Sequence, residues 1–178
     1  MKSKWLAPIA GGLLWALPAQ AQAAGQGPVA TGSAAEGILD QAPMVRAVDP
    51  TTLVRALQGA GYSADLGADP TGDPMITSGA SGSSFQILFY NCTGHKQCSN
   101  VQFFSGYESR KAIGLARINE WNRDRRFARA FLDKKSRPIL QMDVNLDDGG
   151  MSPLLFIDHV EVWAVLLAAF EQHIGYRK

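Results

Sequence analysis

The sequence predicts an α+β fold in which an antiparallel sheet packs against helices. Two stretches rich in aromatic and β-branched residues, at 85–92 and 101–107, flank a short loop, as the strands of a β-hairpin do. Residues 139–147 alternate between apolar and polar side chains, which is typical of a strand with one buried face. A long apolar stripe at helical spacing follows residue 152 and indicates a helix packed on that sheet.

A short helix is the first element expected along the chain. Asp49 suits its N-cap, and Pro50 suits the first helical position, where the backbone N–H has no partner in any case. Apolar side chains then recur at helical spacing: Leu53, Ala56 and Leu57. Gly59 and Gly61 predict the end of this helix.

Three or four strands are expected next. Residues 63–66 and 74–77 are weak strand candidates on either side of a turn-rich run at 69–73, because Gly and Pro interrupt the surrounding chain. Residues 85–92 and 101–107 are the stronger pair. The loop between the stronger strands contains a glycine and predicts a hairpin tip.

A second helix and two further strands are expected in the middle of the chain. The helix is predicted over residues 109–123, and the side chains spaced to face inward are Ile113, Ala116 or Arg117, and Trp121. Residues 127–132 and 139–147 are predicted strands. In the second of these the apolar face is Leu140, Met142, Val144 and Leu146, and the polar face is Gln141, Asp143, Asn145 and Asp147.

A long helix is expected to close the domain. Ser152 suits its N-cap, Pro153 its first position and Gly175 its C-terminal end. The expected core stripe is Phe156, Val160, Trp163, Leu167, Phe170 and Ile174. The neighbouring face is also apolar, through Leu155, Val162, Leu166 and Ala169. Because one packed side does not need so wide a face, we expect the helix to contact a partner subunit in a homodimer as well as its own sheet.

Residues 1–23 have the parts of a cleavable export signal. Lys2 and Lys4 precede an apolar core, and A-x-A patterns predict cleavage after Ala21 or Ala23. The apolar core is much shorter than the roughly 20 residues of a membrane span. We therefore expect a periplasmic or secreted bacterial protein without a transmembrane segment after cleavage. Residues 24–48 lack periodicity and predict a flexible leader, which leaves residues 49–178 as a single domain.

Cys92 and Cys98 are the only cysteines of the chain. An exported protein folds where thiols oxidise, and this spacing closes a short loop at the predicted hairpin tip. We therefore predict a structural disulfide. The loop-entropy relation puts its contribution at about 2 to 2.5 kcal/mol.

The segment from residue 118 to residue 150 carries a resemblance to a known family. Its motifs are Ile118-Asn119-Glu120-Trp121-Asn122, Arg126-Phe127-Ala128-Arg129-Ala130-Phe131-Leu132-Asp133, Ile139-Leu140-Gln141-Met142-Asp143-Val144-Asn145-Leu146 and the turn Gly149-Gly150. In these motifs the chain resembles the YbjN domain family of bacterial sensory transduction regulators, over roughly residues 50–175. The resemblance implies a fold similar to type III secretion chaperones, in the order α-β-β-β-α-β-β-α. In those chaperones the fold dimerises and holds extended peptide segments.

The resemblance supplies no catalytic motif. Trp121 and Asn122 match the family pattern, and we interpret Trp121 as filling the core and Asn122 as ending its helix. The export signal and the cysteine pair distinguish this chain from the cytoplasmic chaperones.

The charge of the chain is unevenly distributed. The segment from Arg110 to Arg137 has ten basic and three acidic residues, whereas the rest of the chain after the signal has five basic and 13 acidic ones. The closest cluster is Arg123, Arg125, Arg126 and Arg129. This segment is interpreted either as a solvated face paired with acids from elsewhere in the fold, or as a docking patch for an acidic protein, peptide or lipid headgroup. The expected compartment argues against nucleic acid as a partner.

No motif predicts a catalytic residue, a metal or a cofactor. A calcium loop starting at Asp143 would need Gly and Glu where the chain has Asp148 and Leu154. The histidines, His95, His159 and His173, show no metal-ligand spacing. The Ser- and Gly-rich run at 78–84 lacks both the nucleophile elbow and the P-loop pattern.

The favoured hypothesis is a non-enzymatic exported protein-binding, chaperone-like or regulatory module. It would use the sheet surface, the region of Arg123 to Arg129 and the long helix. The alternative is a small periplasmic hydrolase or metal-binding protein whose site is assembled from separated residues such as Asp143, Asp147 and His159. A sensory or envelope-stress regulator is a third hypothesis.

Overall fold

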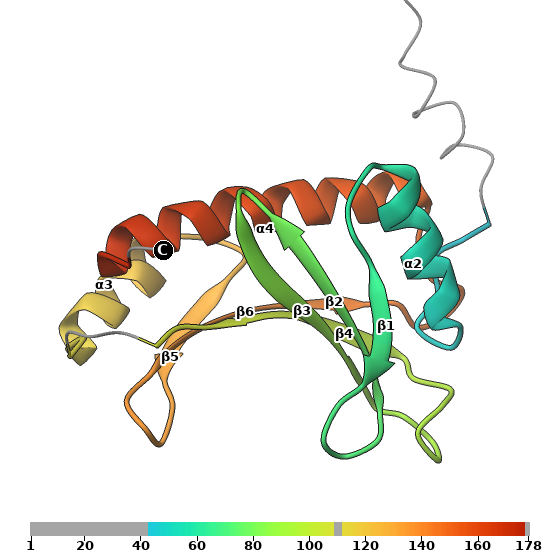
Figure 1. The fold of residues 1–178 in the computed structure, drawn as a ribbon, viewed down its shortest axis with the longest axis horizontal. Helices are drawn as coiled ribbons and strands as arrows, with labels where there is room; N and C mark the ends of the chain where they lie inside the picture. Colours follow the sequence, from blue (N-terminus) through green and yellow to red (C-terminus); the bar gives the residue numbers. More distant parts are fainter. Residues whose placement is uncertain (1–42, 109–111, 177–178) are drawn as a thin grey trace, which may run out of the picture. The chain divides into compact units, whose positions relative to one another are not determined.

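The computed structural model describes residues 43–108 and 112–176, which belong to one compact unit (Figure 1). The helices are α2 (Pro50–Gly59), α3 (Leu115–Asp124) and α4 (Pro153–Ile174). The strands are β1 (Asp65–Ala68), β2 (Pro74–Ala80), β3 (Ser83–Tyr90), β4 (Asn100–Gly106), β5 (Arg129–Leu132) and β6 (Pro138–Asn145). The predicted α+β class is confirmed. Four strands precede α3, one more than the resemblance implies.

The strands form one antiparallel sheet in the order β1-β2-β3-β4-β6-β5. Chain neighbours pair directly from β1 to β4, as short turns dictate. After α3 the chain returns as β5, and β6 then inserts between β5 and β4. The two edges of the sheet are therefore β1 and β5.

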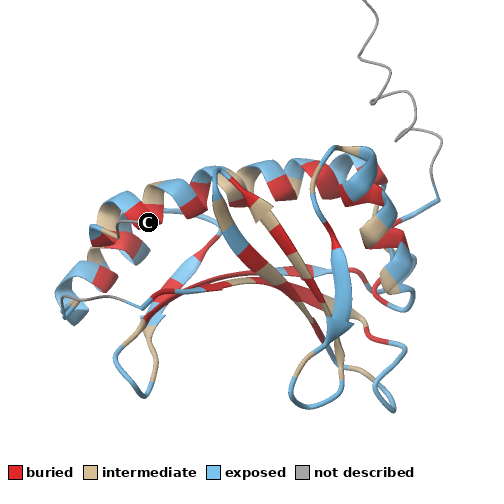
Figure 2. Ribbon diagram, in the orientation of Figure 1, coloured by how far each residue is buried: buried red, intermediate tan, exposed pale blue. Residues whose placement is uncertain are grey.

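The described helices lie on one face of this sheet (Figures 1 and 2). Helix α4 crosses the sheet, with α2 near the β1 end and α3 near the β5 end. The predicted α4 stripe is confirmed, since all six of its members are buried. The ring of Trp163 lies 6.1 Å from that of Phe85 and 5.7 Å from that of Phe103. Burial of each such side chain contributes about 1.5 to 3 kcal/mol.

Among the described residues, α4 is the helix that is long and apolar enough to cross a membrane. Its core stripe is instead covered by the sheet. Part of the additional apolar face also packs internally, because Leu166 is buried. Leu155 and Val165 remain 47% and 70% exposed. The width of the apolar face is thus explained in part by the protein's own core.

The predicted helix ends are confirmed for α2 and α4. The Asp49 side chain accepts a hydrogen bond from the Thr51 amide, and Ser152 Oγ accepts one from the Leu155 amide. Gly175 closes α4 with a φ of 66°, in the left-handed region that glycine adopts without strain.

Three elements begin later than predicted, and the first is β1, which starts at Asp65 instead of residue 63. Helix α3 starts at Leu115, after Gly114 in extended conformation. Trp121 is buried as predicted, but the second buried residue of the helix is Ile118 instead of Ala116 or Arg117. Residues 109–111, where the predicted start lies, are outside the described residues. Strand β5 starts at Arg129, because Phe127 has a φ of 71° and is 69% exposed.

The predicted leader ends too late. The predicted signal, residues 1–23, and residues 24–42 lie outside the described residues. Residues 43–48 belong to the fold, since Val45 is fully buried and exchanges backbone hydrogen bonds with Met151. A Cβ on Gly150, which has a φ of 83°, would lie 2.0 Å from the Val45 carbonyl oxygen. The turn after β6 therefore needs glycine at this position to receive the N-terminal segment.

Candidate protein-binding surface

The second face of the sheet carries no described helix. The strand register aligns the side chains on this open face in rows that cross the strands. They include Met75, Leu88, Tyr90, Gln102, Phe104, Arg129, Phe131, Ile139, Gln141 and Asp143. We call these ten residues the open face.

A polar row runs across three strands of the open face. The Tyr90 hydroxyl donates to Gln102 Oε1 at 3.4 Å, and Gln102 Nε2 donates to Asp143 Oδ1 at 2.6 Å. These residues help to line a depression of about 350 Å³. Burial, reinforced by the Asp143 carboxylate, raises the pKa of Tyr90, so the phenol remains a proton donor at neutral pH.

Apolar side chains lie beside the polar row. Met75 and Leu88 lie in register with Gln102, and Phe104 lies in the next row along β4, which is followed by the Phe131–Ile139 pair. Tyr90 and Phe131 are 43% and 38% exposed. A surface that combines aromatic and apolar groups with polar groups of fixed orientation has the character of a protein interface.

The four clustered arginines have separate surroundings. Arg123 makes two hydrogen bonds with Asp124, at 2.8 and 2.9 Å. Arg125 lies over the Trp121 ring and Arg126 over the Phe127 ring. Arg129 pairs in register with Gln141 and donates to its Oε1 at 2.9 Å, so it belongs to the open face.

Two arginines of the remaining basic segment are paired with acids. Arg117 lies 3.1 Å from Glu120, and Arg137 contacts both Asp133 and Glu108. Hydrogen bonds from the Arg137 amide and side chain, among others, lower the pKa of Asp133. The acids that pair with Arg117, Arg123 and Arg137 are therefore mostly close in sequence, whereas the first of the two interpretations of this segment placed them elsewhere in the fold.

Trp121 and Asn122 attach α3 to the edge strand β5. Trp121 is 1% exposed, stacks edge-on against Phe170 and donates from Nε1 to the Ala128 carbonyl at 3.3 Å. Asn122 does not end the helix, which continues to Asp124. Its Oδ1 accepts from the Ala130 amide at 2.8 Å, and its Nδ2 donates to the Ala130 carbonyl at 2.9 Å.

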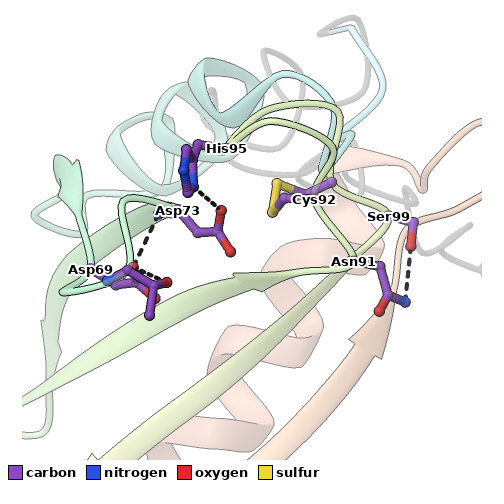
Figure 3. Close-up of a disulfide and its surroundings, with 8 residues drawn as sticks. Asp69, Asp73, Asn91, Cys92, His95 and Ser99 are labelled. Atoms are coloured by element: carbon purple, nitrogen blue, oxygen red, sulfur yellow. Dashed lines mark hydrogen bonds and ion pairs between the residues drawn. A yellow bond between two sulfur atoms is a disulfide. The ribbon is translucent and has the colours of Figure 1, made fainter.

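The predicted disulfide joins Cys92 to Cys98 in the β3–β4 loop. Figure 3 shows this loop next to the β1–β2 turn, with the His95 ring directed at Asp73. His95 Nδ1 lies 2.9 Å from Asp73 Oδ1. The disulfide loop thus braces the turn beside the β1 edge.

The residues of the alternative hydrolase or metal site are spread over the fold. Asp143 belongs to the open face, whereas His159 lies on α4, which covers the opposite face. Asp147 lies in the turn after β6 and accepts from the Asp148 amide. Within residues 43–108 and 112–176, no group of three His, Cys, Asp or Glu side chains is placed to hold a metal.

Tyr90 and Gln102 are site residues that the sequence did not predict. Tyr90 is an ordinary strand residue by composition, and Gln102 breaks the apolar run of β4. The available signal was their common register with β6, which requires knowledge of the pairing between strands distant in sequence.

A family model for YbjN, described as "Putative bacterial sensory transduction regulator", matches residues 49–175. The chain belongs to the YbjN family. The match spans every described element from the N-cap of α2 to the C-cap of α4. Searches of curated proteins and of solved structures found no significant match.

Proposed function

We propose that this YbjN-family protein is a non-enzymatic, exported protein-binding module with a chaperone-like or regulatory role. The observation that carries the proposal is the open face, where apolar side chains lie beside the Tyr90–Gln102–Asp143 row. The family description as a sensory transduction regulator supports a role exercised through a partner protein.

The open face recognises its partner by shape and hydrogen bonding. Asp143 and Arg129 offer charges of opposite sign, and Tyr90 and Phe131 offer exposed aromatic surface. Such aromatic and arginine side chains are the residues that most often dominate binding energy at protein interfaces. Self-association through the exposed side of α4 belongs to the same proposal, with Val165 at its centre.

The location is tested by fractionating cells and sequencing the N-terminus of the periplasmic protein. The proposal expects a chain that starts at Gln22 or Ala24. A full-length chain in the cytoplasm would contradict export.

Binding is tested by capture from periplasmic extract, with light scattering to report oligomeric state. The open-face variant carries Tyr90→Ala and Asp143→Lys, both at exposed positions. The matched control carries Arg123→Glu and Arg126→Glu, which also alters exposed charge but outside the open face. The proposal expects one protein captured by wild type and control and lost by the open-face variant. Equal capture by all three proteins, or none by any, would reject it.

A further inference from the structure

Strand β1 is an edge of the sheet that no described element covers. All four of its residues are exposed, and β2 is its neighbour on one side. Natural edge strands are commonly protected by lysine, proline or a covering element. Positions 66–68 of β1 are Leu, Gly and Ala, so its central backbone is shielded by few side-chain atoms.

The register shows which backbone groups point away from the sheet. The Asp69 amide donates to the Asp73 carbonyl at 2.8 Å, which continues the β1–β2 ladder by one hydrogen-bonded pair. Bonded and non-bonded pairs alternate in an antiparallel ladder, so the Gly67 groups face β2. The N–H and C=O groups of Leu66 and Ala68 therefore face outward. No hydrogen bond from another described residue reaches them.

An apolar depression of about 490 Å³ adjoins this edge. One wall is formed by Leu66 and Ala68, and another by Val48 and Pro50. Cys98 of the disulfide loop also lines it. A strand added beside β1 places alternate side chains on the same side of the sheet, so a small or apolar side chain can enter this depression.

The charges at the two ends of β1 select between possible occupants. Asp65 begins the strand and Asp69 follows it. Asp69 is ionised at neutral pH, and a hydrogen bond from the Thr71 hydroxyl is the main cause that lowers its pKa further from neutrality. Antiparallel pairing of two β1 strands about Gly67 would place Asp65 opposite the Asp69 of the second copy. Like charges in that position are destabilising, whereas a segment with basic flanks would be attracted.

We propose that β1 binds an extended segment of a partner protein as a seventh strand, with small or apolar residues at its centre and basic residues at its flanks. This inference rests on the proposed protein-binding function and specifies the kind of partner. Backbone hydrogen bonds to Leu66 and Ala68 would hold the segment, and the depression and the two aspartates would select its side chains.

The test uses the signal-free chain, residues 24–178, labelled for NMR. The probe is a blocked peptide of alternating valine and threonine between two terminal lysines. A second peptide has glutamate in place of lysine. We expect the lysine peptide to shift the amide signals of residues 65–69 and to slow exchange of the Leu66 and Ala68 amides by at least about tenfold. Absence of these changes, or equal binding of the glutamate peptide, would overturn the proposal.

Leu66→Pro removes one outward N–H without removing a ladder bond, a substitution that edge strands tolerate. This variant should lose at least about tenfold in affinity for the peptide, the equivalent of one hydrogen bond. An N-methylated peptide removes the complementary bonds, from peptide N–H groups to the Leu66 and Ala68 carbonyls, so this arm of the test does not depend on the folding of the variant. Unchanged affinity in either experiment would contradict strand addition.

Capture from periplasmic extract with the Leu66→Pro variant distinguishes a failure of strand addition at β1 from a failure of the proposed function. If Leu66→Pro retains a partner that the open-face variant loses, β1 is not the binding edge and the proposed function stands. If wild type captures no protein, the proposed function itself is rejected.

Discussion

The two edges of the sheet end in different ways. At β5, the Asn122 side chain hydrogen-bonds both the amide and the carbonyl of Ala130, in the manner of a neighbouring strand. At β1, the outward groups of Leu66 and Ala68 have no described partner. An unpaired strand edge is a template for another strand. One amide side chain, held by the helix that carries it, thus occupies the outward backbone groups at Ala130 of β5, whereas no described side chain does so on β1.

The two edges also differ in charge. The β5 end carries Arg126 and Arg129, whereas Asp65 and Asp69 bound β1 at the other. The uneven charge of the sequence therefore becomes a difference between two ends of one sheet. Partners of opposite charge would be attracted to the two ends.

The largest expected effect comes from removing the Trp121 side chain, which attaches α3 beside the edge strand β5. Trp121→Ala should lower the free energy of unfolding by about 3 to 5 kcal/mol, because it leaves a cavity against Phe170. Denaturant unfolding followed by circular dichroism measures this loss. Trp121→Phe should lose less, since it keeps aromatic packing but not the bond to the Ala128 carbonyl. Equal losses in both variants would assign the effect to that hydrogen bond.

The next largest expected effect concerns the Cys92–Cys98 loop, which lies next to the turn beside the edge strand β1. Replacing both Cys92 and Cys98 with alanine should lower the free energy of unfolding by about 2 to 2.5 kcal/mol through the greater entropy of the unfolded chain. Urea unfolding of oxidised, reduced and double-alanine protein provides the comparison. A reduced wild type as stable as the oxidised protein would contradict this expectation. The reduced and alanine proteins should behave alike.

The third effect is expected from Asn122→Ala, which removes the side chain that bonds to the backbone of the edge strand β5. It should lower the free energy of unfolding by about 1 to 2 kcal/mol, since the backbone groups of Ala130 lose their partners. The variant should also self-associate at high concentration, which sedimentation velocity detects. Asn122→Asp keeps an acceptor for the Ala130 amide and should show a smaller effect. A monomeric alanine variant of wild-type stability would show that Asn122 does not protect this edge.

The smallest expected effect is a pH dependence of stability that arises from Asp69, in the turn after β1. The pKa of Asp69 is lowered in the folded protein, chiefly by the Thr71 hydroxyl. Its stabilising contribution is therefore present above the unfolded pKa of about 3.9 and disappears as pH falls through the lower folded value. Asp69→Asn should unfold at lower urea concentration than wild type at pH 6, and this difference should shrink by pH 2. A constant difference between these pH values would assign the effect to the amide substitution itself.

The helices and most strands could be predicted because their signals are local. Asp49-Pro50 and Ser152-Pro153 mark helix starts by capping chemistry, and the α4 stripe repeats over several turns. The predicted start of α3 at residue 109 was wrong, because the extended Gly114 interrupts a stretch that is otherwise compatible with a helix. The late start of β5 depends on the positive φ of Phe127, which its residue type does not favour.

The candidate sites could be predicted only in part. The Cys92–Cys98 bond could be predicted from the loop spacing and from the expectation of an oxidising compartment. The role of Asn122 could not be predicted, because its partner Ala130 is reached only when α3 folds back on β5. The same limit applies to the row of Tyr90, Gln102 and Asp143, which lie on three strands.

The sequence by itself determined the α+β class, the caps, the core stripe of α4 and the cysteine pair, since each depends on residues close together in the chain. Only the tertiary structure decided that β6 lies between β4 and β5, that β1 is an edge without a described covering element, and that the arginine cluster is divided between the open face and the α3 end. The physical reason is that strand order and side-chain rows depend on pairing between segments that are distant in sequence. The interactions between those segments form only when the chain folds.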